Sequence, residues 1–180
     1  MPSRRALLQA SAAVAASGSL GAPLVLPAAA QTAGTQRLPD RPAPAIGATI
    51  DIPRTTLIDG RVIEPGAWRG KVLLVQLWAT WCPFCRKQNP LLDQLWRARQ
   101  KDGIELLGLS IDEKPDAIKR YVDEHGYRFP VARFGEAWWT AIGRPKGLPI
   151  LWVIGRDARL KQIEIGEMFP EDIELLERWL

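Results

Sequence analysis

The sequence predicts an α/β domain, because segments typical of strands and segments typical of helices alternate after residue 54. The run 71–78 is nearly all apolar, which is typical of a strand buried on both faces of a sheet. After it, leucine and tryptophan recur at helical spacing between residues 83 and 101. The composition is that of an ordinary globular protein and no internal repeat is found, so we expect one α/β sandwich.

A β-hairpin is predicted ahead of the buried strand. Residues 55–58 and 61–63 flank Asp59-Gly60. Glycine tolerates the positive φ that a two-residue hairpin turn requires. We therefore expect such a turn at Asp59-Gly60.

The remaining elements follow from similar patterns. The helix after the buried strand is expected from about Pro83 to Lys101, because Gly103 suits a helix C-terminus. Further strands are expected at 104–111, 150–154 and 160–165, and further helices at 116–125, 138–142 and 170–180. Core packing is the expected role of Trp78, Trp138, Trp139 and Trp152.

The formal charge of +4 does not indicate a nucleic-acid partner. Arg4 and Arg5 lie in residues 1–30, which contain no acid, and without them the charge is +2. The other basic residues are spread along the chain with acids close by, so they form no concentrated basic stripe. We therefore expect no nucleic acid among the partners.

Residues 1–30 have the pattern of a cleaved signal peptide. The two arginines precede a mildly apolar, alanine-rich stretch, and residues 28–30 are alanines suited to cleavage. The opening 3–9 resembles the twin-arginine export motif, with departures at Leu7 and Gln9. Gly18, Gly21 and Pro23 interrupt the apolar stretch, which makes a permanent membrane-spanning helix the weaker alternative.

Three segments are thus predicted: a signal peptide at 1–30, a flexible leader at 31–45, and a folded domain at 46–180. Export from a bacterial cytoplasm implies the periplasm, and a membrane-anchored form with an uncleaved signal is a second possibility. The periplasm is oxidising, so thiols stay reduced there only if electrons are delivered.

Cys82 and Cys85 are the only cysteines, and their Cys-x-x-Cys spacing indicates redox chemistry. Two such close residues cannot form the disulfide framework of a small secreted domain. A four-ligand zinc site is not expected, because His125 is the only histidine. We expect no metal and no cofactor other than the disulfide, and we assign His125 no catalytic role.

The position of the pair predicts which cysteine attacks. Cys82 follows the buried strand where a helix begins, near unpaired backbone N–H groups and the positive end of the helix dipole. This placement favours the thiolate. Cys85 lies one turn later on the same face. We predict that Cys82 attacks a disulfide and that Cys85 resolves the resulting mixed disulfide.

Two motifs resemble the thioredoxin superfamily: Trp81-Cys82-Pro83-Phe84-Cys85 after a hydrophobic strand, and Gly147-Leu148-Pro149 before another. The predicted hairpin, the segments 69–71 and 78–82, and Gly147-Leu148-Pro149 are most similar to the exported TlpA, ResA and CcmG branch. The resemblance covers roughly residues 43–180. It implies a thioredoxin-like three-layer sandwich with an added N-terminal β-hairpin, and the activity of a thiol-disulfide oxidoreductase.

The resemblance also implies a substrate-binding surface. Pro149 should follow a cis peptide bond and face the disulfide, which leaves the backbone of Leu148 free to pair with an extended substrate. Trp81 should cover the disulfide and contribute apolar surface for a partner. Pro83 and Phe84, between the cysteines, should border the same surface and tune the redox couple.

One further position matches the thioredoxin family, and three positions depart from it. Pro90 matches the proline that kinks the active-site helix of thioredoxins. Gln76 replaces a buried aspartate or asparagine, Gln88 replaces a frequent glutamate, and Ile150 replaces a common threonine. Glutamine cannot take a proton, so a relay through these side chains is in doubt. A hydrogen-bonded or solvated glutamine is the simpler expectation.

Three functions are consistent with these residues. The leading hypothesis is a periplasmic reductase that passes electrons from a membrane thiol reductase to disulfides of exported proteins, for instance in cytochrome c maturation. A DsbA-like oxidant that forms disulfides would use the same residues in reverse. A Cu(I)-binding metallochaperone is a further alternative, because paired thiolates suit that ion.

Overall fold

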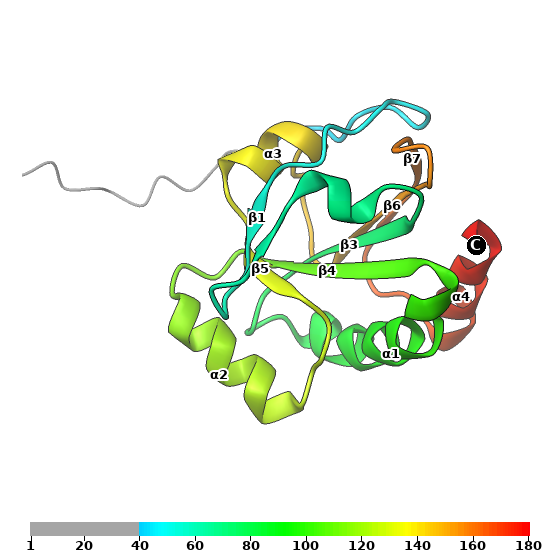
Figure 1. The fold of residues 1–180 in the computed structure, drawn as a ribbon. Coiled ribbons are helices and arrows are strands. Elements are labelled where there is room, and N and C mark those ends of the chain that lie inside the picture. Colours follow the sequence, from blue (N-terminus) through cyan, green and yellow to red (C-terminus); the bar gives the residue numbers. More distant parts are fainter. Residues whose placement is uncertain (1–39) are drawn as a thin grey trace, which may run out of the picture. The chain divides into compact units, whose positions relative to one another are not determined.

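A computed structural model describes residues 40–180, which form the α/β sandwich that the sequence predicts (Figure 1). The central sheet has the strand order β5-β4-β3-β6-β7. Its strands are β3 (Val72–Trp78), β4 (Ile104–Ser110), β5 (Val131–Arg133), β6 (Ile150–Ile154) and β7 (Leu160–Ile165). The first three run parallel, whereas β6 and β7 pair antiparallel, so the sheet is mixed.

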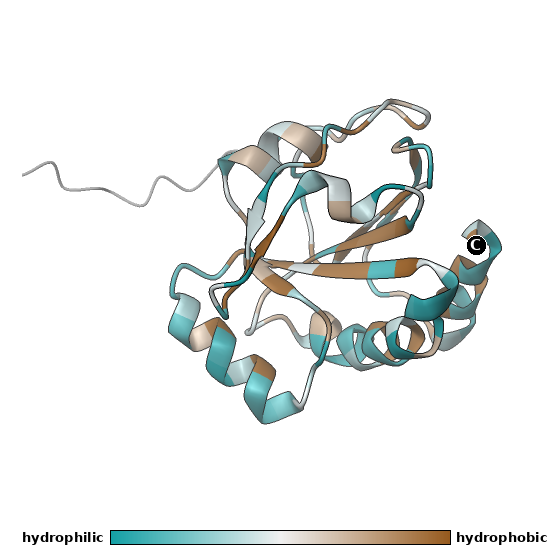
Figure 2. Ribbon diagram, in the orientation of Figure 1, coloured by the Kyte–Doolittle hydropathy of each residue, from teal (hydrophilic) through white to brown (hydrophobic). Residues whose placement is uncertain are grey.

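Helices and the N-terminal hairpin cover the two faces of the sheet. The helices are α1 (Pro83–Arg99), α2 (Pro115–His125), α3 (Glu136–Ile142) and α4 (Pro170–Glu174). Leu74 of β3 shares one buried cluster with Leu92 of α1, whereas its neighbour Leu73 shares the other with Trp138 of α3. Every residue of β3 is buried, and Figure 2 shows the hydrophobic strands between the more polar outer helices. These two covered faces give the three layers that the resemblance implies.

The hairpin is present, but its turn is longer than predicted. Strands β1 (Thr55–Thr56) and β2 (Val62–Ile63) pair antiparallel. The amide of Leu57 donates to the carbonyl of Arg61 at 2.8 Å, which leaves the three residues 58–60 in the loop. Gly60 has φ +86, as the last residue of a three-residue hairpin loop requires. The prediction of a two-residue turn at Asp59-Gly60 is therefore wrong.

Some boundaries also differ from the prediction. The sequence pattern missed β5, whose three residues are too few to show a period. Helix α3 begins two residues before the expected 138–142. The expected helix 170–180 is α4 followed by a 3-10 helix at Leu175–Trp179, and α1 likewise passes into a 3-10 turn at Gln100–Asp102 before Gly103.

One of the four tryptophans assigned to the core lies at its edge. Trp78, Trp138 and Trp152 are buried, as predicted. Trp139 is only half-buried, and the guanidinium of Arg41 lies 4.9 Å from its ring centroid. Trp139 is partly buried and packs against the same cluster as Trp138, so the predicted core packing holds for it only at the cluster's edge.

The predicted signal peptide and most of the leader lie outside the described residues. The described part of the leader contacts the domain, since Arg41 and Arg144 exchange backbone hydrogen bonds of 2.9 and 2.8 Å. Arg144 also pairs with Asp40 at 2.7 Å. Contacts with the domain thus begin before the predicted boundary at Ile46. Within residues 40–180, no helix is both long and apolar enough to cross a membrane.

Candidate active site

The two cysteines form a disulfide at the N-terminus of α1. Cys82 is the residue that precedes the helix, with extended backbone angles, and Pro83 takes the first helical position, where its missing N–H is not needed. The Cys82 sulfur accepts a hydrogen bond from the amide of Cys85 at 3.2 Å. Cys82 is 3 % exposed and Cys85 fully buried. The cysteine that was predicted to attack is therefore the slightly more exposed residue of a buried pair.

The prediction of a cis bond between Leu148 and Pro149 is confirmed. Ile150 pairs with Leu77, so Pro149 lies at the end of β3 from which the chain continues to the cysteines. Leu148 is half-buried, and none of the described residues hydrogen-bonds its backbone. Ile150 itself is a fully buried sheet residue. The cis proline and the disulfide thus occupy the same edge of the sheet.

Apolar side chains are exposed beside the disulfide. Trp81 is 68 % exposed and Phe84 is 49 % exposed, and Pro83 between them is also exposed. The ammonium of Lys87 lies 5.7 Å from the Phe84 ring centroid. Large exposed apolar side chains that flank a reactive group are typical of a surface that binds a partner. Trp81 is thus available for contact, in line with its predicted position.

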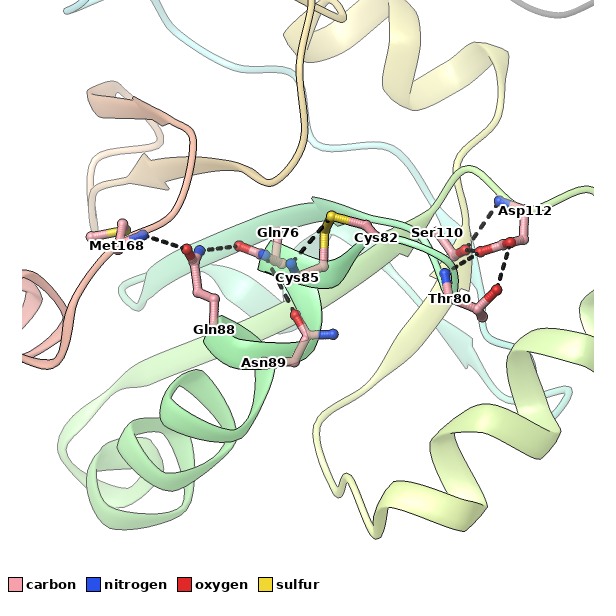
Figure 3. The surroundings of a disulfide bond; sticks show 9 residues. All are labelled: Gln76, Thr80, Cys82, Cys85, Gln88, Asn89, Ser110, Asp112 and Met168. Carbon is pink, nitrogen blue, oxygen red and sulfur yellow. Dashed lines mark hydrogen bonds between the residues drawn. A yellow bond between two sulfur atoms is a disulfide. The ribbon is translucent and has the colours of Figure 1, made fainter.

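Three buried carboxamides lie next to the disulfide (Figure 3). Gln88 donates from Nε2 to Oε1 of Gln76 at 3.0 Å, and its Oε1 accepts from the amide of Met168 at 2.7 Å. Gln76 donates to Oδ1 of Asn89 at 3.5 Å. All three side chains are fully buried, so the glutamines are hydrogen-bonded rather than solvated. None of these three carboxamides titrates. Their hydrogen bonds connect α1 to the loop before α4.

A second polar cluster fixes the link between β3 and Cys82. Oδ2 of Asp112 accepts from the amide of Thr80 at 2.9 Å and from the Ser110 hydroxyl at 2.6 Å, whereas Oδ1 accepts from the Thr80 hydroxyl at 2.8 Å (Figure 3). Sequence reasoning missed Ser110 and Asp112. The available signal was two polar residues at the carboxyl end of a strand parallel to β3.

A group of aromatic side chains connects β3 with α2. The rings of Trp78 and Tyr121 are 5.6 Å apart, and Tyr121 stacks on His125 at 3.9 Å. Burial raises the pKa of the Tyr127 hydroxyl well above its ordinary value, although the charge of Arg86 opposes this. His125 is exposed at the C-terminal end of α2, and its Nδ1 lies 2.9 Å from the carbonyl oxygen of Tyr121. His125 therefore contacts Tyr121 through its ring and through its Nδ1 atom.

The described residues hold no cluster of side chains suited to a metal ion. Among residues 40–180, no group of three or more histidine, cysteine, aspartate and glutamate side chains is arranged to hold a metal ion. Around the two sulfurs the described residues place buried carboxamides, the Asp112 carboxylate and exposed apolar side chains.

Comparison with known proteins agrees with this geometry. The sequence profile of the AhpC/TSA family matches residues 40–133. The chain is 30% identical over 119 residues to the thiol-disulfide oxidoreductase ResA of Bacillus anthracis, which covers 66% of this chain and 69% of that protein. It is 26% identical over 151 residues to the ResA of Geobacillus kaustophilus, covering 84% and 87%.

Solved structures share the fold. A thiol:disulfide interchange protein of the thioredoxin family from Chlorobium tepidum superposes with a TM-score of 0.64 at 23% identity, covering 79% of this chain and 99% of that one. StoA from Bacillus subtilis gives 0.58 at 18% identity, covering 76% and 98%. At these identities the likeness concerns the fold.

Proposed function

Because the chain belongs to the AhpC/TSA family and is a thiol-disulfide oxidoreductase of the ResA type, we propose that it is a periplasmic reductase of disulfides in exported proteins. The observation that carries the proposal is the placement of Cys82. Cys82 is the slightly more exposed residue of the pair, it lies at a helix N-terminus, and the fully buried Cys85 follows one turn later. A thiolate at such a position is both stabilised and accessible to a disulfide.

The reaction runs in two exchanges. In the reduced protein, the Cys82 thiolate attacks one sulfur of the substrate disulfide, forming a mixed disulfide and releasing the other substrate sulfur as a thiolate. The Cys85 thiolate then attacks the Cys82 sulfur and releases the second substrate thiolate. The substrate has gained two electrons, and the protein is left with the Cys82–Cys85 disulfide that the structure contains.

The surface around the pair supports a polypeptide substrate. Trp81, just before Cys82, and Phe84, between the two cysteines, offer exposed apolar contacts. The backbone of Leu148, unpaired among the described residues, can bond to an extended segment of substrate. Together these groups suit a disulfide carried by a peptide chain.

The electron donor follows from the proposed compartment. A periplasmic dithiol is regenerated only if electrons cross the membrane, so a membrane thiol reductase is the proposed donor. The similarity of residues 69–71, 78–82 and 147–149 to the exported TlpA, ResA and CcmG branch supports the reductive direction and a role such as cytochrome c maturation.

The deciding measurement is the reduction potential of the Cys82–Cys85 couple in the full chain, obtained by equilibration with defined thiol buffers. A potential near that of thioredoxin, about −270 mV, supports a reductase. A potential near about −120 mV would instead make the protein a DsbA-like oxidant. Cys82→Ser should abolish turnover, whereas Cys85→Ser should accumulate the mixed disulfide.

Export is tested separately. Replacing both Arg4 and Arg5 with lysine should retain the protein in the cytoplasm if residues 1–30 direct it to the twin-arginine pathway. Fractionation of cells with an antibody to the chain measures this. Unchanged periplasmic recovery of the double variant would exclude that pathway, and cytoplasmic recovery of the unsubstituted chain would exclude export.

A further inference from the structure

The three-residue link between β3 and Cys82 is held by one side chain, that of Asp112, which follows the end of the neighbouring strand β4. Thr80, in the middle of this link, donates its amide and its hydroxyl to the two carboxylate oxygens of Asp112. Among the described residues, no other side chain hydrogen-bonds residues 79–81. The remaining polar contact is the backbone bond from Cys82 to Ala79 at 3.2 Å.

The carboxylate that anchors the link is itself fixed. The Ser110 hydroxyl donates to Oδ2 of Asp112, and the Asp112 amide donates back to the Ser110 oxygen at 3.1 Å. Ser110 is fully buried and pairs in register with Trp78, the last residue of β3. Asp112 is therefore held in place by the end of β4, which pairs with the end of β3, where the link begins.

A carboxylate that accepts three hydrogen bonds forms strong, charge-assisted contacts. Thr80 lies two residues before Cys82, and the adjoining Trp81 is largely exposed and supplies little restraint. Cys82 itself accepts the Arg86 amide at its carbonyl oxygen at 3.1 Å, and the anchor at Thr80 adds a restraint on the link that leads to it. Loss of that restraint would remove part of the stabilisation of the thiolate.

From these contacts we infer that Asp112 is a positioning residue for Cys82, acting through Thr80. The inference rests on the proposed role of Cys82 as the attacking cysteine. The negative charge of Asp112 would by itself disfavour a thiolate nearby. Positioning and charge therefore act in opposite directions and can be separated by substitution.

Asp112→Asn and Asp112→Ala both remove the charge, but only asparagine can keep the hydrogen bonds. Its Oδ1 can accept from the Thr80 amide and the Ser110 hydroxyl, and its Nδ2 can donate to the Thr80 hydroxyl oxygen. A difference between the two variants thus reports the hydrogen bonds alone. Arg86 and Lys87, the nearest basic residues in sequence, are unchanged in both.

The experiment measures the alkylation of Cys82 by iodoacetamide in the reduced full chain as a function of pH, with mass spectrometry to separate Cys82 from Cys85. The pH of half-maximal labelling should be higher in Asp112→Ala than in Asp112→Asn by about 0.5 to 1 unit, which is roughly a threefold to tenfold smaller thiolate fraction. Equal midpoints in the two variants would overturn the inference.

A second pair of variants keeps the test decisive if Asp112→Ala does not fold. Thr80→Ser retains both donors to Asp112, whereas Thr80→Ala loses the hydroxyl, so the labelling midpoint of Thr80→Ala should be the higher. Equal labelling midpoints in Thr80→Ser and Thr80→Ala would also refute the role of Asp112 as a positioning residue. Faster labelling of Cys85 than of Cys82 in the unsubstituted chain would overturn the attacking role of Cys82, and the anchor's proposed purpose with it.

Discussion

Replacing Gln88 with alanine should lower the free energy of unfolding by about 2 to 6 kcal/mol. Gln88 is fully buried and makes two hydrogen bonds, accepting from the Met168 amide and donating to Gln76. Alanine would leave one buried donor and one buried acceptor without partners, and each such group costs about 1 to 3 kcal/mol. The affected contacts connect the active-site helix with the loop before α4.

Urea unfolding of the oxidised chain, followed by tryptophan fluorescence, measures this loss. Gln94→Ala is the matched control, because Gln94 is an exposed residue of the same helix and its truncation should cost less than about 0.5 kcal/mol. Gln88→Glu keeps the acceptor for Met168 but loses the donor to Gln76, and should also destabilise. If Gln88→Ala were as stable as Gln94→Ala, the buried carboxamides would not join helix and loop.

Three further predictions concern the surroundings of the site. Asp93→Ala should cost about 2 to 4 kcal/mol in urea unfolding, because the nearly buried Asp93 carboxylate accepts from the amides of Arg128 and Phe129; a loss below about 1 kcal/mol would contradict this. Burial raises the pKa of Tyr127 above its ordinary 10.0, so the folded chain keeps a proton that the unfolded chain releases. The free energy of unfolding should therefore decrease as pH rises above about 10, and less steeply in Tyr127→Phe; an equal slope in both would refute the assignment. Phe84→Ala should slow reduction of a protein disulfide more than that of oxidised glutathione, without change in urea stability, because Phe84 is half exposed; equal slowing of both substrates would argue against docking.

The parts of the molecule that the sequence predicted are those specified by neighbouring residues. An uninterrupted apolar run defined β3, and the disulfide lies within five consecutive residues that also begin α1. The cis bond before Pro149 was predicted from a resemblance, because no local energetic argument selects the cis form. Short or edge elements carry less signal, as β5 shows with its three residues.

Contacts between separate segments explain the length of the hairpin turn and the edge position of Trp139. The turn length depends on which amide meets which carbonyl, and the bond from Leu57 to Arg61 adds one residue to the loop. Asp59-Gly60 is equally compatible with a two-residue and a three-residue loop, so composition could not decide between them. For Trp139, hydrophobicity alone predicted the core, whereas its face of α3 meets the leader at Arg41.

The polar groups that support the redox centre are specified by the tertiary fold, and this is why sequence inspection missed most of them. Asp112 reaches Thr80 across 32 residues and Met168 reaches Gln88 across 80. Each contact exists only because the sheet register aligns Trp78 with Ser110, or because the loop before α4 returns to α1. A glutamine at position 88 looks like a solvated helix residue until that loop covers it. The cysteines can therefore be predicted from their motif. The groups that hold them in place can be identified only when the pairing of β3 with β4 and the course of the C-terminal loop are known.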